Sequence, residues 1–149
     1  MVVMWLLHIP RRMGKVSGVD SLVGIYSYSL RALREMIIIT FNVRGVGGHP
    51  RFLALHRIFY SVNPDVILIQ DTMTVDEKDR EVFSRVLTGW KMCTVDVVGQ
   101  SGGLLSAWNP LTVKSYPFLF VAGILLIGRE KDMDYLVSIV NCYGPYSNR

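Results

Sequence analysis

The sequence predicts an α+β fold with a mixed β-sheet. Up to Gly89, short β-branched apolar runs alternate with helical patterns, and beyond it apolar runs follow one another across short turns. Strands linked through helices pair in parallel, whereas strands joined by tight turns pair antiparallel. The chain has 149 residues, half of them hydrophobic, which is enough for one packed core but not for two ordinary domains.

The first 35 residues differ in charge from the rest. Residues 1–35 contain five of the 16 Lys and Arg but only two of the 12 Asp and Glu. Residues 36–149 contain the other eleven basic and ten acidic residues. The excess behind the net charge of +4 therefore lies in residues 1–35, and charge alone does not argue for DNA binding. We interpret residues 1–35 as a poorly structured N-terminal extension and residues 36–149 as the domain.

Neither a membrane span nor secretion is expected. The apolar run at residues 1–10 is too short to cross a bilayer, and its charges, Arg11 and Arg12, follow it instead of preceding it as in a signal peptide. Cys93 and Cys142 lie far apart in apolar runs without metal-type spacing, which favours buried thiols. We therefore expect an intracellular protein, nuclear or cytoplasmic.

The first half of the domain predicts two strands and two helices. A β-branched strand at residues 36–41 ends at Asn42, before the glycine-rich turn at residues 45–48. A helix begins at Pro50 and ends near residues 63–64; its apolar stripe consists of Leu55, Ile58, Phe59 and Val62. A second buried strand, residues 65–71, precedes a capping box at residues 74–77 and a second helix whose apolar face is formed by Val82, Phe83, Val86 and Leu87.

The second half predicts a β-meander. Strand-like runs occupy residues 90–97, 103–108, 118–127 and 135–143, with a turn at Asn109 and Pro110. Polar residues end three of the predicted strands: Asn42, Asp71 and, after Asn141, Tyr143. We expect these groups to gather at one sheet edge. Mg²⁺ prefers oxygen ligands, typically one or two carboxylates with neutral oxygens and water, so Asp71 and the Asn42 amide meet part of its requirement.

Four segments together resemble the endonuclease/exonuclease/phosphatase superfamily, most closely the endonuclease domain of plant LINE-type non-LTR retrotransposons. They are ITFNVRGVGG, NPDVILIQDT, GQSGGLLSAWNP and NCYGP, which occur in the family's order and at about its spacing across residues 36–146. The resemblance implies a partial four-layer α/β-β/α sandwich whose C-terminal half would lie beyond Arg149. It also implies a Mg²⁺-dependent phosphodiesterase site that acts on DNA, with no small-molecule cofactor.

The resemblance also assigns roles to single residues. Asn42 matches a strand-end Asn that organises the metal and phosphate, and Asp71 matches the metal-binding acid, so both are candidate catalytic and metal residues. Tyr143 matches a tyrosine that contacts the scissile phosphate. Phosphate or nucleic-acid contacts are implied for Arg44 and for the small-residue loop at Ser101 and Gly102.

Departures from the family pattern predict an inactive chain. The family has Glu where this chain has Asp71, and the lost methylene retracts the carboxylate by roughly 1 Å, which can cost on the order of 10²-fold in rate. Tyr146 replaces an Asn. The family's later Gly-Asp-Phe-Asn-type segment and Asp-His pair occur nowhere in the chain, and we interpret His8, His49 and His56 as surface residues. The function expected is a truncated, inactive DNA endonuclease-like domain derived from a retrotransposon.

Other interpretations of the same residues remain open. Asn42 would suit a turn, Asp71 a cap, Tyr143 an ordinary sheet position and Gly102 a bulge. The glycines at residues 45–48, between a strand and a helix, suit a Rossmann-like dinucleotide-binding protein, with Asp65 or Asp71 as the ribose-binding acid, although the meander does not. A third alternative is a non-catalytic interaction module, or a fragment without an evolved role, that self-associates through an exposed sheet.

Overall fold

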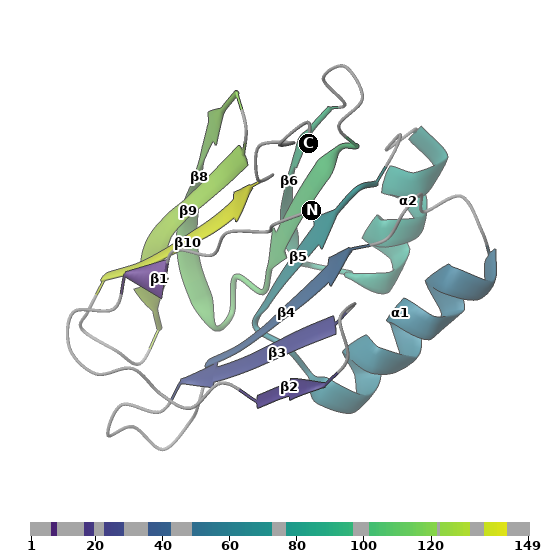
Figure 1. Cartoon of the computed structure of the whole chain (residues 1–149), viewed down its shortest axis with the longest axis horizontal. Coiled ribbons are helices and arrows are strands. Elements are labelled where there is room, and N and C mark those ends of the chain that lie inside the picture. The colour runs from purple at the N-terminus through teal and green to yellow at the C-terminus, as the bar shows by residue number, and fades with distance from the viewer. Residues whose placement is uncertain are drawn as a thin grey trace, which may run out of the picture.

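The described part of the chain forms two β-sheets and two helices (Figure 1). The computed structural model describes residues 7–8, 17–19, 23–28, 36–42, 49–72, 77–96, 102–121, 123–131 and 136–142. The helices are α1 (His49–Val62) and α2 (Glu77–Val86). The larger sheet contains, in spatial order, β2 (Ser17–Val19), β3 (Val23–Tyr28), β4 (Met36–Asn42), β5 (Val66–Gln70), β7 (Leu104–Trp108) and β6 (Lys91–Val95). The smaller sheet contains β1 (Leu7–His8), β10 (Leu136–Cys142), β9 (Gly123–Glu130) and β8 (Val113–Phe120).

The larger sheet is mixed, as the sequence predicts. β4 and β5 are parallel, with α1 as the crossover between them, and β5 is antiparallel to β7, which is antiparallel to β6. A parallel pair needs a crossover, whereas β8 and β9 form a hairpin. The predicted α+β class therefore agrees with the two sheets and two helices.

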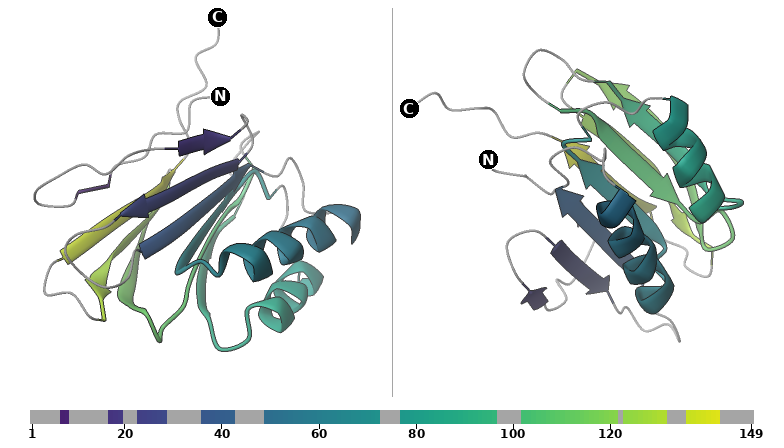
Figure 2. Two further views of the ribbon diagram at one scale, coloured as in Figure 1. Left: turned by 90° about the horizontal axis from the view of Figure 1, so that it is seen from below. Right: turned by 90° about the vertical axis from the view of Figure 1, so that its right-hand side faces the viewer.

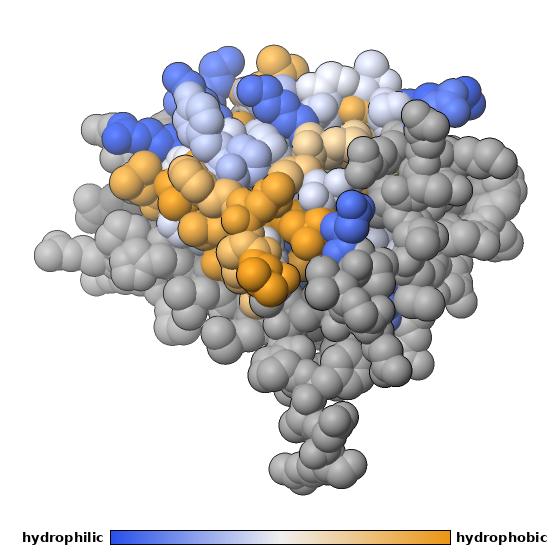
Figure 3. Space-filling view, turned by 90° about the horizontal axis from the view of Figure 1, so that it is seen from above, coloured by the Kyte–Doolittle hydropathy of each residue, from blue (hydrophilic) through white to orange (hydrophobic). Residues whose placement is uncertain are grey.

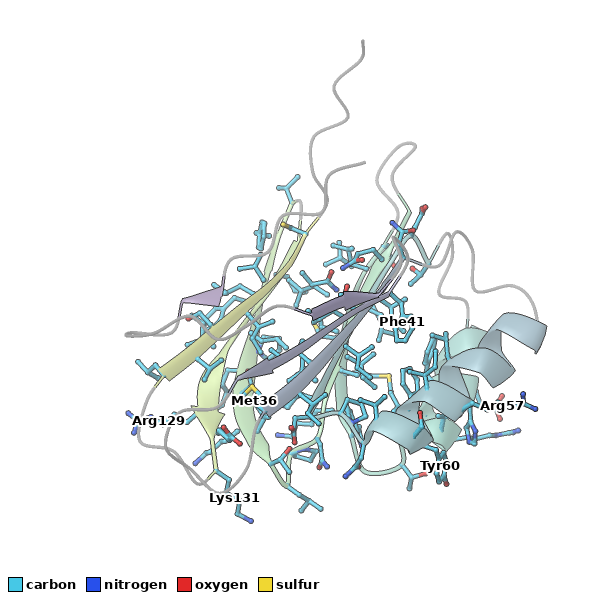
Figure 4. All side chains as sticks on the ribbon, turned by 60° about the horizontal axis from the view of Figure 1, so that its bottom comes forward. Met36, Phe41, Arg57, Tyr60, Arg129 and Lys131 are labelled. Carbon is cyan, nitrogen blue, oxygen red and sulfur yellow. The ribbon has the colours of Figure 1, made fainter. Side chains whose placement is uncertain are left out.

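The layers are helices, larger sheet and smaller sheet (Figure 2). Alternate residues of a strand point to opposite faces. Phe41 therefore belongs to the core under the helices, where its ring meets that of Phe59 edge-on at 6.0 Å between centroids, and Met36 belongs to the core between the sheets (Figure 4). All five residues of β5 are buried, because both of its faces are covered.

The predicted strands and helices of residues 36–108 match the structure closely. α1 begins one residue before Pro50, and β5 begins one residue after Asp65. The apolar run at residues 118–127 differs, because the chain turns near Val121 and the run supplies the end of β8 and the start of β9. Because apolar residues lie on both sides of this turn, the hydrophobicity pattern does not reveal it.

Strands also occur within residues 1–35, where the sequence suggested little structure. β3 pairs antiparallel with β4 from Val23 opposite Phe41 to Tyr28 opposite Met36, and β1 pairs with β10. The boundary at residue 35 stays a prediction, and β3 ties this segment to the larger sheet.

Candidate functional site

The candidate site lies where β4 and β5 end side by side. Asn42 is opposite Gln70 in the parallel register, and Asp71 follows Gln70 directly. Parallel strands end at the same side of a sheet, so both polar side chains lie at this end, which we call the carboxyl edge. Both residues are half-buried.

Asp71 has a left-handed backbone conformation, with φ of 62°. A residue with a side chain is uncommon there, although Asp and Asn tolerate it best. Such conformations cost free energy, and they cluster at active sites and ligand-binding segments. The backbone therefore turns sharply at the residue for which the resemblance implies a metal ligand.

Two glycines let the segment before β7 close against the carboxyl edge. A Cβ on Gly102 would clash with the Asp71 carboxylate and lie 2.8 Å from its Cα, and a Cβ on Gly103 would lie 2.5 Å from Thr72 Oγ1. The Thr72 amide donates a hydrogen bond to the Gly103 carbonyl oxygen at 3.1 Å. The predicted small-residue loop thus meets the predicted acid, with no space for a larger residue.

A buried polar cluster lies directly beneath this edge. Gln70 Nε2 donates to Asn141 Oδ1 at 2.9 Å and to Thr40 Oγ1 at 3.3 Å. Asn141 Nδ2 donates to the Leu105 carbonyl at 3.0 Å and to Ser106 Oγ at 3.1 Å. These bonds join β10 of the smaller sheet to β4, β5 and β7 of the larger one.

Sequence reasoning missed this cluster. The available signal was a single polar residue inside each of several apolar strands, such as Gln70 in β5 and Ser106 in β7. Fully buried polar side chains are expected to be hydrogen-bonded, but the sequence does not tell which residues pair. The cluster holds the two sheets in one relative position at the carboxyl edge.

Three of the six predicted site residues are described, and all three lie at the carboxyl edge. Gly102 closes on Asp71, and Asn42 lies opposite Gln70, the residue before Asp71. Tyr143, Arg44 and Ser101 lie outside the described residues. Asn141, two residues before Tyr143, is hydrogen-bonded to Gln70 at this same end.

The donor atoms at the carboxyl edge fit a hard cation in part. Asp71 supplies a carboxylate, Asn42 an amide and Thr72 a buried hydroxyl oxygen without a hydrogen-bond partner among the described residues. Mg²⁺ is commonly held by one or two carboxylates with water in the remaining positions. Within the described ranges, no group of three or more His, Cys, Asp or Glu side chains is placed to hold a metal ion. The set therefore fits Mg²⁺ held loosely by one carboxylate.

Asp65 has a structural role at the opposite end of β5. Its Oδ2 accepts a hydrogen bond from the Ile37 amide at 2.9 Å, and its own amide donates to the Ile37 carbonyl at 2.8 Å. The side chain is buried and binds the backbone of β4 where the β4–β5 pair begins. A ribose-binding acid in a dinucleotide fold lies instead beyond the carboxyl ends of the strands, so Asp65 does not suit that role and Asp71 is the remaining candidate of the Rossmann-like alternative.

Other reactive side chains of the described residues are two cysteines and His56. Cys93 and Cys142 form no disulfide; burial raises the pKa of Cys93 above its ordinary value, and a hydrogen bond with the Thr94 backbone offsets part of this rise. The His56 ring lies 4.8 Å from that of Tyr60, which projects with Arg57 from the outer side of α1 (Figure 4). Neither helix of the described chain is long and apolar enough to cross a membrane.

Comparison with known proteins leaves the family open. No protein-family model matches the chain, and no curated protein matches it. The function must therefore be argued from the carboxyl edge itself.

Proposed function

We propose that this chain is a Mg²⁺-binding, DNA-directed phosphodiesterase-like domain of the endonuclease/exonuclease/phosphatase type, related to LINE-type retrotransposon endonucleases. Asp71 and Asn42 hold the metal in this proposal, and the 149 residues alone cleave DNA poorly or not at all. The observation that supports it is that Asn42, Asp71 and Gly102, which the resemblance singles out, all lie at one strand-end edge, where Gly102 closes on Asp71.

The layer order supports the same proposal. Helices cover one face of a mixed sheet and a second sheet packs on the other, as expected for three layers of a four-layer α/β-β/α sandwich. The cluster of Gln70 and Asn141 keeps the two sheets together at the end where the metal would bind. A bound Mg²⁺ would supply Lewis-acid stabilisation of charge on a phosphate oxygen.

Cleavage of DNA by these residues alone is expected to be weak for a chemical reason. Among the described residues, Asp71 is the carboxylate that meets Gly102 at the carboxyl edge, and no group of three or more His, Cys, Asp or Glu side chains is placed to hold a metal ion. The family's later Asp-His pair, which the resemblance makes responsible for orienting the water and stabilising charge, has no counterpart in the sequence. Metal binding is therefore expected to be measurable where strand cleavage is not.

Calorimetry with Mg²⁺ on the full chain tests the metal site. We expect saturable binding that Asp71→Ala abolishes and that Glu81→Ala, which removes an exposed carboxylate on α2, leaves unchanged. Asp71→Glu extends the carboxylate and should bind Mg²⁺ more tightly. Equal binding by the wild type and Asp71→Ala would refute the proposed site.

Plasmid nicking in Mg²⁺ tests the claim that the 149 residues alone cleave DNA poorly or not at all. The wild-type chain and Asp71→Ala should both stay at the background of the buffer. Nicking by the wild type that is lost in Asp71→Ala would overturn the claim that these residues are insufficient for cleavage.

A further inference from the structure

Three strands of the larger sheet run in the same direction and end at the carboxyl edge. β4 and β5 are parallel, as their arrows in Figure 1 show. β5 and β6 are each antiparallel to β7, the strand between them, so β6 runs the same way as β5. Asn42 is the last residue of β4, Asp71 follows β5, and Asp96 follows β6. The carboxyl edge therefore has a second acid, which the resemblance does not single out.

The residue before Asp96 lies close to Thr72. A Cβ on Gly103 would lie 2.5 Å from Thr72 Oγ1 and 3.0 Å from the carbonyl oxygen of Val95, so both oxygens lie against the same side of Gly103. The Thr72 amide also donates a hydrogen bond to the Gly103 carbonyl oxygen at 3.1 Å. The end of β6 is therefore held against the segment that follows β5, through the glycines that precede β7.

Thr72 has a hydroxyl group for which the fold provides no partner. The residue is 1% exposed, and its Oγ1 has no hydrogen-bond partner among the described residues. Buried polar side chains are nearly always hydrogen-bonded, because an unpaired one costs free energy. This oxygen follows one acid in the chain and lies beside the strand that ends at the other. It therefore points to a ligand at this place.

The spacing of the strands suits a cation between the two acids. Only β7 separates β5 from β6, so their backbones lie roughly 9.5 Å apart, twice the spacing of neighbouring strands. The Asp71 carboxylate extends toward Gly102, on the β7 side. Asp96 is exposed and Asp71 half-buried, and Figure 3 looks onto the molecule from this end, where hydrophilic side chains lie beside hydrophobic ones. Mg²⁺ keeps several waters and is held by one or two carboxylates, so a hydrated ion fits such a span.

We propose that Asp96 is the second acid of the magnesium site, so that one Mg²⁺ is held between the ends of β5 and β6 with the Thr72 hydroxyl as a neutral oxygen. This inference rests on the proposed function and adds to it a residue outside the resemblance. Two carboxylates attract a divalent cation more strongly than one does. The site therefore binds Mg²⁺ more firmly than Asp71 alone would.

Calorimetry with Mg²⁺ on the full chain tests the second acid. Asp96→Asn should weaken binding about 10- to 100-fold, the range for loss of a group that supports a metal site, and Asp96→Glu should restore most of the affinity. Glu81→Gln, which removes the same charge from α2, is the matched control and should bind as the wild type. Asp96→Asn binding as tightly as the wild type would overturn the inference.

A double-mutant cycle tests whether the two acids share one ion. One ion should bind per chain, and Asp96→Asn should have little further effect in a chain that already carries Asp71→Asn, because the shared ion is lost. Two ions per chain, one of which remains in each single variant, would contradict a shared site.

The same titrations separate this inference from the proposed function. If Asp71→Ala abolishes binding while Asp96→Asn leaves it unchanged, the inference fails and the proposed function stands. If the wild-type chain binds no Mg²⁺, both fail.

Thr72→Val separates a ligand-binding hydroxyl from a structural one. Valine has nearly the same shape without the hydroxyl, so we expect weaker Mg²⁺ binding and a melting midpoint that is unchanged or higher, because a buried unpaired group is removed. Thr72→Ser keeps the hydroxyl and should keep the Mg²⁺ affinity. A lower melting midpoint of Thr72→Val with unchanged Mg²⁺ affinity would show that the hydroxyl serves the fold and would overturn its part in the site.

Discussion

Asp71 combines an uncommon backbone conformation with the carboxylate that is the candidate metal ligand. Its φ of 62° is a conformation that glycine adopts without penalty, yet the chain has an acid there. The other described non-glycine residue with positive φ, Asn63, simply follows the end of α1, where an Asn in this conformation is ordinary. A turn explains Asn63, whereas the position of Asp71 between Asn42 and Gly102 suggests a functional reason.

Asp71→Gly separates these explanations. If the carboxylate serves the metal, glycine removes Mg²⁺ binding and leaves the free energy of unfolding unchanged or raised by up to about 1 kcal/mol, because the backbone relaxes. Urea unfolding and calorimetry measure both. Loss of more than about 1 kcal/mol would mean that Asp71 is a structural cap, and Asn63→Gly serves as the control for relaxation alone.

Asn141 is the residue on which the buried cluster depends. Asn141→Leu removes the partner of Gln70 Nε2 and of Ser106 Oγ, and a buried group left without a hydrogen bond costs about 1–3 kcal/mol. We expect destabilisation in that range by urea unfolding. Ser138→Leu, on the half-exposed outer side of β10, should cost much less; equal losses would show that the cluster adds no stability.

At the scale of elements, the carboxyl edge was predictable and the buried cluster was not. Two apolar runs separated by a helical pattern predict parallel strands, and parallel strands bring Asn42 and Asp71 to one side. The contact between Gly102 and Asp71 depends on how the later β7 enters beside β5, which no local pattern specifies. The partners of Gln70 likewise depend on packing between two sheets.

Gly102→Ala tests whether the segment before β7 shapes the metal site. The added methyl would displace the Asp71 side chain, so we expect Mg²⁺ affinity to fall about tenfold or more, with destabilisation of about 1–3 kcal/mol from overpacking. Gly128→Ala is the matched control, because its Cβ would lie 2.6 Å from Ser115 Cα, on the smaller sheet. Gly128→Ala should destabilise the chain similarly and leave Mg²⁺ affinity unchanged. A tenfold loss of Mg²⁺ affinity in Gly128→Ala would mean that destabilisation alone, and not the contact of Gly102 with Asp71, lowers the affinity.

At the scale of the whole molecule, the sequence predicted the class but not the full extent of the sheets. Binary patterns identify strands and helices, whereas the pairing of β3 with β4 and of β1 with β10 joins distant segments through backbone bonds that leave little trace in composition. The same holds for residues 118–127, because this apolar run resembles a buried strand until the turn and the register expose one face.

Deletion of residues 1–35 tests how far the first strands belong to the domain. The deletion removes β3 and leaves the edge of β4 unpaired, so we expect the melting midpoint to fall by about 10 °C or more and the chain to aggregate. Circular dichroism and light scattering measure both effects. Deletion of residues 1–6 keeps every described strand and should change neither; identical melting of the two deletions would place the domain boundary at residue 35 after all.

The central claim is that the carboxyl edge binds Mg²⁺, and a Mg²⁺ titration followed by amide chemical shifts in ¹H–¹⁵N spectra of the full chain tests it most directly. The account predicts saturable shifts concentrated at Asn42, Asp71, Thr72, Gly102 and Gly103, and their absence in Asp71→Ala. Shifts confined to exposed acids away from this edge, such as Glu81, or no saturable shift at all, would contradict it.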